Sequence, residues 1–166
     1  MAAGVSDDSG RKLLWVLHGV NLDMLGSRDP AHYGTLTLAE LEETVAGEAG
    51  HLGFTVRRYQ SNHEGDLVER LHDIAREGAD AVLINLGAWT HYSYALRDAL
   101  ELVEAPVAEV HLSDIASREE WRRRSVIADL AAVRVSGKGV DGYLEAVRAL
   151  AEMAGAEPEA GSAAKD

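Results

Sequence analysis

The chain has 166 residues and a formal net charge of −12, so we expect one domain without a broad nucleic-acid or anionic-membrane surface. A hydrophobic share of 46% with 27% charged residues is typical of a soluble globular protein. The absence of cysteine excludes disulfides, thiolate nucleophiles and zinc–sulfur sites. No apolar run suits a signal peptide or a membrane span, which favours a cytoplasmic protein.

Both ends of the chain have the composition of tails. Residues 1–10 are small and polar, and residues 155–166 are rich in Ala, Gly and Glu without any periodicity, which is typical of disorder. We therefore expect a single ordered domain over residues 11–154.

The first half of this domain begins with a continuous apolar run at residues 12–17, which is typical of a central parallel strand buried on both faces. Thr37 and Glu40 then match a capping box, and apolar residues at helical spacing follow as far as Leu52. A second strand is expected at 54–59, and a second helix after it ends near Gly78.

The second half continues the alternation of strands and helices. Residues 81–85 form the most hydrophobic strand, and a helix with apolar positions from Leu96 to Val103 stops before Pro106. Strands are expected at 107–111 and 131–135, and a final helix from about residue 142 to 153.

Strict alternation predicts right-handed crossovers and a parallel sheet covered by helices on both faces. We expect a flavodoxin-like, doubly wound, five-stranded sheet in a three-layer α/β/α arrangement, with strand order 2-1-3-4-5. In this order the switch point lies between strands one and three. The loops after Leu17 and Asn85 should therefore meet, with the loop after Val110 beside them.

The loop after the first strand carries Asn21, Arg28 and Tyr33 among three glycines. A cation beside a tyrosine favours the phenolate, so Arg28 and Tyr33 together suit a catalytic base. Ligands of open α/β sheets bind at such strand ends, which makes this loop a candidate site.

Polar residues also follow the third and fourth strands. Asn85, Gly87, Thr90 and His91 follow the third, and His111 and Ser113, then Arg118 and Arg122 one helical turn on, follow the fourth. Strand alternation places Glu109 on the same side as His111, where its carboxylate would hold the imidazole. Each residue alone also fits a structural role, but the convergence of three loops favours a site.

Other motifs carry less weight. The Gly137-Lys138-Gly139 run lacks the P-loop pattern, and no cluster of acids and histidines has metal-ligand spacing, so we expect neither cofactor nor metal. Residues 122–124 are three arginines typical of a solvated helix face, although one turned inward would suffice for substrate binding. Trp15 and Trp121 are expected to be packing residues.

Several blocks of the sequence resemble the type II 3-dehydroquinate dehydratase family of the shikimate pathway. They are HGVNLDMLGSRDPAHYG, YQSNHEGDLVERLHDI, INLGAWTHYSYALRDAL, VAEVHLSDIASREEWRRRS and SGKGVDGYLEAV. The resemblance extends from Leu13 to about Met153. It implies a hydro-lyase that dehydrates 3-dehydroquinate to 3-dehydroshikimate by anti elimination through an enolate, without metal or cofactor.

The resemblance also implies catalytic roles. Tyr33, ionised with the help of Arg28, would take the proton next to the substrate ketone, and Asn21 would hold a water that stabilises the enolate. His111, positioned by Glu109, would protonate the departing hydroxyl. Such an acid and base suit the chemistry, because an α-proton needs a base and hydroxide needs a general acid to leave.

For binding, the resemblance implies that Leu112 and Ser113 hold the substrate carboxylate. Asn85, His91 and Arg122 would contact its ring hydroxyls. Residues 26–34 would form a mobile lid, and Asp98 would reach across a trimer interface within a dodecamer built from trimers. We expect the helix with Arg118 to begin just beyond Ser113, where its N-terminal amides would favour the anion.

Six residues depart from the family pattern: Val20 and Leu86 stand for Pro, Asp23 and Asp114 for Asn, Tyr92 for Thr and Trp89 for Tyr. A carboxylate of Asp114 about 7 Å from the substrate's own would cost roughly 2 kcal/mol unless it points away. Two alternatives therefore stay open. One is a paralogue that uses the same acid–base residues on a related polar cyclic substrate, and the other is a non-catalytic flavodoxin-like binding domain.

Overall fold

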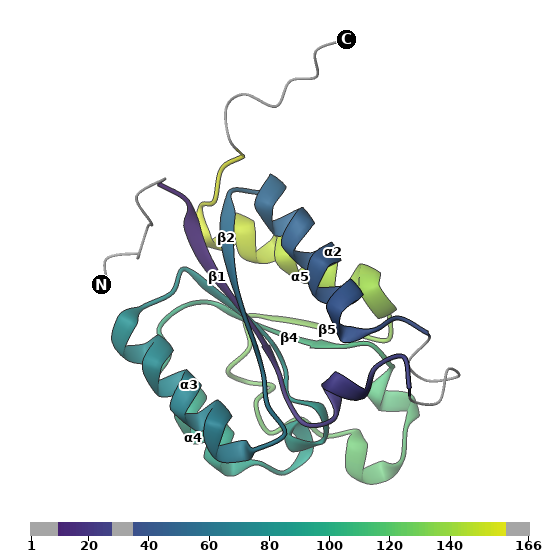
Figure 1. Cartoon of the computed structure of the whole chain (residues 1–166). Helices are drawn as coiled ribbons and strands as arrows, with labels where there is room; N and C mark the ends of the chain where they lie inside the picture. Colours follow the sequence, from purple (N-terminus) through teal and green to yellow (C-terminus); the bar gives the residue numbers. More distant parts are fainter. Residues whose placement is uncertain (1–9, 28–34, 159–166) are drawn as a thin grey trace.

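A five-stranded parallel sheet forms the centre of the computed structural model, which describes residues 10–27 and 35–158 (Figure 1). Its strand order is β2-β1-β3-β4-β5, which confirms the order predicted from the sequence. Every neighbouring pair of strands is parallel, with register partners such as His18 and Asn85 at the ends of β1 and β3. The strands are β1 Lys12–His18, β2 Phe54–Gln60, β3 Ala81–Asn85, β4 Val107–His111 and β5 Val133–Ser136.

Helices cover both faces of this sheet and complete the predicted three layers. Two of them, α2 (Leu38–His51) and α5 (Gly139–Ala154), lie side by side on one face, while α3 (Glu64–Glu77) and α4 (Tyr94–Leu100) cover the other (Figure 1). Short 3₁₀ helices follow three of the strands. They are η1 (Leu22–Met24) after β1, η2 (Gly87–His91) after β3, and η3 (Ile115–Ser117) and η4 (Glu120–Arg122) after β4.

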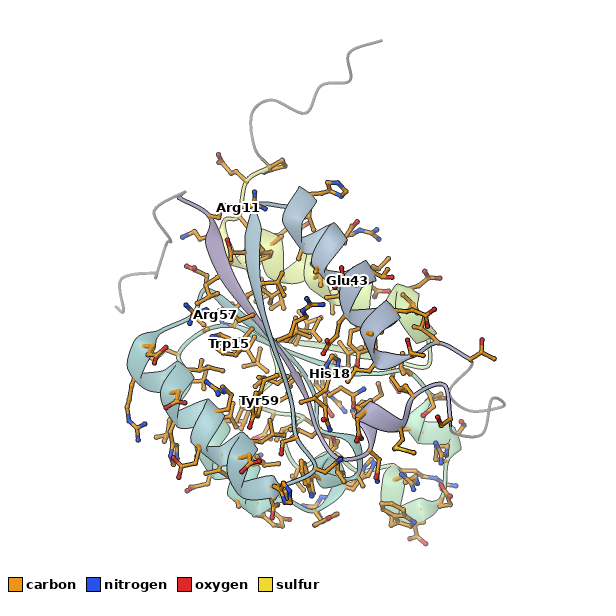
Figure 2. The ribbon with its side chains drawn as sticks, viewed as in Figure 1. Arg11, Trp15, His18, Glu43, Arg57 and Tyr59 are labelled. Carbon is orange, nitrogen blue, oxygen red and sulfur yellow. The ribbon has the colours of Figure 1, made fainter. Side chains whose placement is uncertain are left out.

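The apolar run of β1 is buried on both faces, as expected of a central parallel strand. Leu14 and Val16 pack beneath α2 and α5, whereas Leu17 packs on the face of α3 and α4. Trp15 shares this second face, and the Arg57 guanidinium lies 5.7 Å from its ring centroid (Figure 2). The prediction that Trp15 is a packing residue is therefore confirmed.

The capping box predicted for the first long helix is present at the start of α2. The Thr37 hydroxyl oxygen accepts a hydrogen bond from the Glu40 backbone N–H at 3.3 Å, and the Glu40 carboxylate accepts from the Thr37 N–H at 2.8 Å. Both bonds satisfy backbone donors that have no partner inside the helix. The start of α2 is thus determined locally.

Three elements differ from the predicted bounds by more than one residue. Helix α4 ends at Leu100 instead of reaching Val103, because the N–H groups of Leu102 and Val103 bond to carbonyls three residues back and form tight turns in place of a further helical turn. Strand β5 spans 133–136 instead of 131–135, since pairing with β4 sets its register. Helix α5 begins at Gly139, three residues earlier than expected.

The expected helix containing Arg118 is also absent from the described chain. Asp114 caps the three-residue η3, and Arg118 has extended backbone with φ −88° and ψ −174° between η3 and η4. The N–H groups of Ile115 and Ala116 donate to the side chains of Ser136 and Asp114. These amides are therefore already paired, and the expected helix N-terminus for an anion was wrong.

The expected tails, residues 1–10 and 155–166, fall largely outside the described residues. After α5, Ala156 packs against the core and the Glu157 carbonyl passes close to Gly53, where a Cβ would lie 2.1 Å from that oxygen. In the described part of the chain, no helix combines the length and apolarity needed to cross a membrane.

Candidate active site

The loops after β1 and β3 meet at the carboxyl end of the sheet, as the strand order predicted. The Gly19 N–H donates to the Asn85 carbonyl at 2.8 Å, and a Cβ on Gly19 would lie 2.2 Å from the Leu86 carbonyl oxygen. Gly87, at φ +62°, would bring a Cβ to 2.5 Å from the Val20 carbonyl oxygen. Only glycine permits so close an approach of the two backbones.

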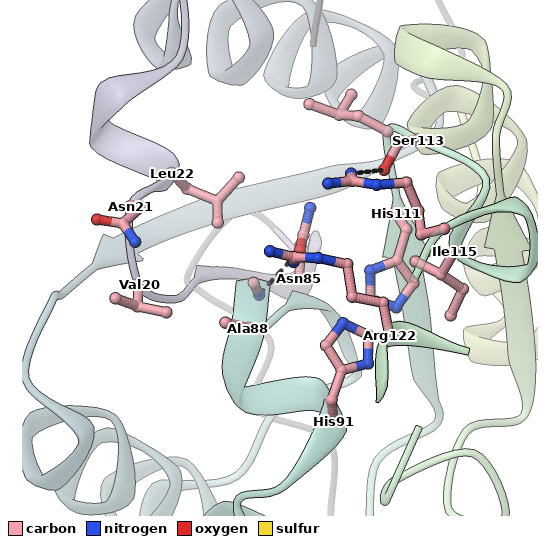
Figure 3. Close-up of a pocket in the computed structure, with 13 residues that line it drawn as sticks. Val20, Asn21, Leu22, Asn85, Ala88, His91, His111, Ser113, Ile115 and Arg122 are labelled. Atoms are coloured by element: carbon pink, nitrogen blue, oxygen red, sulfur yellow. Dashed lines mark hydrogen bonds between the residues drawn. The ribbon is translucent and has the colours of Figure 1, made fainter. Parts of the chain in front are cut away.

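A cavity lies where these two loops face the loop after β4 (Figure 3). It is lined by seven of the residues to which the resemblance gave a catalytic or binding role: Asn21, Asn85, His91, His111, Leu112, Ser113 and Arg122. Its remaining lining residues are Val20, Leu22, Gly87, Ala88, Ile115 and Arg118. The three polar loops thus converge on one hollow at the switch point of the sheet.

His111 and Glu109 form a buried acid pair on one side of this cavity. The His111 Nε2 donates to a Glu109 carboxylate oxygen at 2.8 Å, and the Glu109 side chain is 1% exposed. Burial raises the pKa of this carboxyl, but hydrogen bonds from His111, Ser125 and Arg134 and the charge of His111 outweigh it, so the pKa lies below its usual value. Glu109 is therefore held as a carboxylate that orients the imidazole.

His91 stacks beside His111 with ring centroids 6.4 Å apart, and its Nδ1–H donates to the Arg124 carbonyl at 2.7 Å (Figure 3). Burial is the largest cause that lowers the pKa of His91, and the charges of His111 and Arg122 lower it further. A neutral imidazole with one N–H committed to a carbonyl has its other nitrogen available as an acceptor.

Trp121 is 51% exposed, so the expectation that it is a packing residue was wrong. Its ring meets the edge of His91 at 5.4 Å between centroids, and the Arg122 guanidinium lies 3.9 Å from its centroid. The residue belongs to the three-residue η4, which has no buried residues and therefore no apolar face that packs on the core. It supports the positions of two residues that line the cavity.

Two arginines give the cavity a positive wall in an otherwise acidic chain. The Nε atoms of Arg118 and Arg122 lie 3.3 and 3.1 Å from a Glu119 carboxylate oxygen, and Arg118 also donates to the Ser113 hydroxyl oxygen at 3.3 Å. Among the three consecutive arginines, Arg122 is the one that lines this cavity. The sequence placed Arg118 in the loop without a role, and the structure adds it to the site.

Asn21 adopts left-handed backbone at φ 64°, a conformation that asparagine tolerates better than most residues. Its N–H donates to the Asn62 side-chain oxygen at 2.7 Å, and the Asn62 amide donates to the Asp23 carboxylate at 2.8 Å. The turn is thus supported from the loop after β2. Asn62 lies 41 residues away from Asn21, and no local pattern indicated this contact.

The side chain of Asn85 is oriented by a hydrogen bond to Tyr143 of α5. Its side-chain amide donates to the Tyr143 hydroxyl at 2.9 Å, while its oxygen accepts from the Gly87 N–H at 3.1 Å. Burial raises the pKa of the fully buried Tyr143, which is therefore neutral. The sequence indicated Tyr143 only as one apolar position of the final helix.

The predicted base does not belong to the described part of the chain, since Arg28 and Tyr33 lie outside the described residues. The two ends of the segment that carries them are close in space. A Cβ on Gly26 would lie 3.1 Å from the Thr37 methyl group and 3.4 Å from the Thr35 carbonyl oxygen. Asp98 is exposed on α4 and does not line the cavity of its own chain.

A family model described as "Dehydroquinase class II" matches residues 12–151. The chain belongs to this family. It is 50% identical over 141 residues to a 3-dehydroquinate dehydratase from Leptothrix cholodnii, covering 85% of this chain and 95% of the relative. It is 51% identical over 148 residues to one from Pelobacter propionicus, covering 89% and 99%. The resemblance found in the sequence is confirmed.

Solved structures of the family share the fold. A type II dehydroquinase from Propionibacterium acnes matches with a TM-score of 0.81 at 38% identity, covering 85% of this chain and 97% of that one. A second, from Butyrivibrio crossotus, also reaches 0.81, at 35% identity, covering 84% and 97%. The flavodoxin-like class predicted from the alternation of elements is confirmed.

Most of the departures from the family pattern lie away from the cavity. Asp114 turns its carboxylate to the Ala116 N–H, Trp89 is buried in the core, and Tyr92 is exposed elsewhere. Asp23 accepts from Asn62 and Leu86 is buried in the core, so only Val20 of the six residues lines the cavity. The repulsion considered for Asp114 does not arise in this geometry.

The described residues, 10–27 and 35–158, contain no group of side chains suited to bind a metal ion. No three histidine, aspartate or glutamate side chains gather there in a way that would hold an ion.

Proposed function

We propose that this protein is a hydro-lyase that dehydrates 3-dehydroquinate, the compound after which its relatives are named. The identity of about 50% over most of the length of those relatives is the observation that carries the proposal. The buried acid pair beside a cavity at the switch point supports it. Five of the six departures lie outside that cavity, which favours 3-dehydroquinate over a different cyclic substrate.

His111 is the general acid in this proposal. Its Nε2 is committed to Glu109, so the other ring nitrogen is available to the substrate. As the carbon–oxygen bond to the tertiary hydroxyl breaks, that oxygen takes the imidazolium proton and leaves as water. Glu109 stabilises the imidazolium and fixes the orientation of the ring, as acids do for catalytic histidines.

Tyr33 is the proposed base, and Arg28 favours its phenolate. The phenolate takes the proton from the carbon beside the ketone, and the electron pair forms an enolate before the hydroxyl leaves. Asn21, at the cavity wall, would hold the water that stabilises this enolate. The segment with Tyr33 begins and ends next to Gly26, four residues after Leu22 of the cavity lining.

The substrate carboxylate would bind at Leu112 and Ser113. Arg118, whose guanidinium donates to the Ser113 hydroxyl oxygen, supplies a nearby positive charge. The ring hydroxyls would meet Asn85, His91 and Arg122. The amide of Asn85 is already oriented by Tyr143 and Gly87, so it presents a fixed edge to the substrate.

The chain in solution is proposed to form an oligomer built from trimers, in the cytoplasm, with Asp98 contributing to a neighbouring site. Light scattering of the purified protein tests the assembly, and a stable, active monomer at micromolar concentration would contradict it. Exchange of Asp98 for Asn should then weaken substrate binding in the assembled protein.

The experiment that tests the reaction mixes purified protein with 3-dehydroquinate and follows the ultraviolet absorbance of the conjugated enone product. Tyr33→Phe removes only the ionisable oxygen and should lower kcat by about 10²–10⁴ with little change in KM. Tyr92→Phe is the matched control, because Tyr92 is exposed and does not line the cavity. Turnover of Tyr33→Phe near that of the control would eliminate this base.

A further inference from the structure

His111 separates two hollows. One is the site cavity, and the second is lined by His111 together with Glu109, Arg134, Arg123 and Asp114. Arg134 reaches the acid pair through this second hollow and not through the substrate cavity. Its side chain is 46% exposed, while that of Glu109 is 1% exposed.

Strand pairing places Arg134 beside the acid pair. Glu109 of β4 and Arg134 of β5 are register partners in the sheet, so both side chains leave it on the same face. The Arg134 Nε donates to one Glu109 carboxylate oxygen at 2.9 Å, and His111 Nε2 donates to the other at 2.8 Å. Ser125 also bonds to this carboxylate.

We propose that Arg134 is a positioning residue of the acid pair: it holds the Glu109 carboxylate toward His111 and offsets part of its negative charge, so that the imidazolium gives up its proton more readily. The inference rests on the proposed function for its catalytic consequence. With only His111 and Ser125 as partners, the Glu109 carboxylate would be less firmly oriented and, lacking a cation beside it, would bind the imidazolium proton more strongly. A buried acid shared between a histidine and an arginine avoids both effects.

Other charged groups face His111 from the surrounding elements. His91 of η2, Arg118, and Arg122 of η4 line the same cavity, and Asp114 and Arg123 line the second hollow. None of them makes the contact of Arg134 with Glu109 in the described structure. The substitution of Arg134 keeps all of these other charged side chains. A change in the pH profile of the variant is therefore attributed to the loss of Arg134.

The test compares Arg134→Met with Arg148→Met. Arg148 is also half-exposed, and its Nε lies 2.6 Å from the Glu48 carboxylate on the opposite face of the sheet, so the control removes the same charge from a different ion pair. We expect Arg134→Met to lower kcat about tenfold, which is the size of loss typical when a residue that orients a functional side chain is removed. The KM should change less than about twofold, because Arg134 does not line the substrate cavity.

The pH profile separates positioning from a merely structural role. Without the nearby cation, His111 keeps its proton to higher pH, so the alkaline limb of kcat should move upward by up to about one pH unit in Arg134→Met. Arg134→Lys restores the charge and should return the limb toward its wild-type position. An unmoved limb, or a kcat equal to that of Arg148→Met, would overturn the inference.

A measurement without substrate makes the result independent of the reaction. Nuclear magnetic resonance titration of the His111 ring, assigned with His111→Gln, should show its midpoint at higher pH in Arg134→Met and unchanged in Arg148→Met. An unmoved midpoint overturns the inference whatever the substrate is. A moved midpoint in a protein that does not convert 3-dehydroquinate would reject the proposed function alone. Arg134→Gln replaces Arg134→Met if the latter does not fold.

Discussion

Two histidine–glutamate pairs lie at the carboxyl end of this sheet, and they differ in their position relative to the cavity. His111, the last residue of β4, bonds to Glu109 at 2.8 Å. His18, the last residue of β1, bonds to Glu42 of α2 at 3.1 Å. The first pair borders a cavity, whereas the His18 side chain is fully buried and packs 5.8 Å from the Tyr143 ring.

Strand alternation explains the difference. In β1, Leu14 and Val16 face α2 and α5, so His18 points to that same covered side. In β4, Ala108 and Val110 take that side, and Glu109 and His111 point to the opposite face. A buried histidine paired with a carboxylate is thus no sufficient sign of an acid catalyst. Access to a cavity on the correct face distinguishes the proposed catalytic pair, His111 and Glu109, from the structural pair, His18 and Glu42.

The largest expected effect comes from exchanging one residue of each pair. His111→Ala should lower kcat by about 10²–10⁴, because the leaving hydroxyl loses its proton donor. His18→Gln should keep kcat within about threefold, since His18 does not line the cavity. Steady-state kinetics with 3-dehydroquinate measures both, and circular dichroism verifies folding. Equal losses in the two variants would remove the distinction between the pairs.

A smaller effect concerns stability against pH at the catalytic pair. The pKa of Glu109 lies below its usual value of 4.5, because the hydrogen bonds outweigh burial, so its carboxylate stabilises the fold above about pH 4.5. This contribution is lost as the pH falls through the lowered pKa. Glu109→Gln should therefore be less stable than wild type at pH 7, by roughly 2 kcal/mol, the size of a hydrogen bond to a charged group.

The gap between the two proteins should narrow in acid. Urea unfolding at pH 7 and near pH 4 measures it, provided that both proteins remain folded at the lower pH. A gap that stays constant or widens as the pH falls would show that the ionised Glu109 contributes nothing to folding.

The smallest effect concerns Tyr143, whose ring packs beside His18 of the structural pair and whose hydroxyl bonds to Asn85. Tyr143→Phe removes the hydroxyl that accepts from the Asn85 amide. The cost should be about 1 kcal/mol, because the Asn85 amide loses one hydrogen-bond partner. Urea unfolding should show this loss together with a higher KM, since Asn85 is free to rotate. An unchanged KM would indicate that Tyr143 does not orient the substrate-binding amide.

Much of this architecture was predictable from local patterns. Apolar runs and alternating helices indicated all five strands and their order, and two glycines in facing loops suited the close contact at Gly19 and Gly87. The proximity of Glu109 and His111 follows from a spacing of two residues in a strand. These features depend on short stretches of chain or on general rules of topology.

The contacts that were missed join distant segments. Arg134 bonds to Glu109, 25 residues away in the sequence, and Tyr143 bonds to Asn85, 58 residues away. The local hydrophobic pattern indicates neither contact. The stretch after Ser113 has charged residues at helical spacing, yet Asp114 and Ser136 take up its N–H groups and only two 3₁₀ turns form. Side-chain competition of this kind depends on where the neighbouring strand ends.

The close contact between Gly26 and the stretch 35–37 has a consequence for engineering. Because Gly26 lies beside residues 35 and 37, the described chain on either side of segment 28–34 is anchored at one place. The entropy of closing such a loop grows only slowly with its length. We therefore expect these two anchors to accept replacements for the segment between them: exchange for a short glycine–serine linker, or for libraries of altered length, should leave the described fold in place.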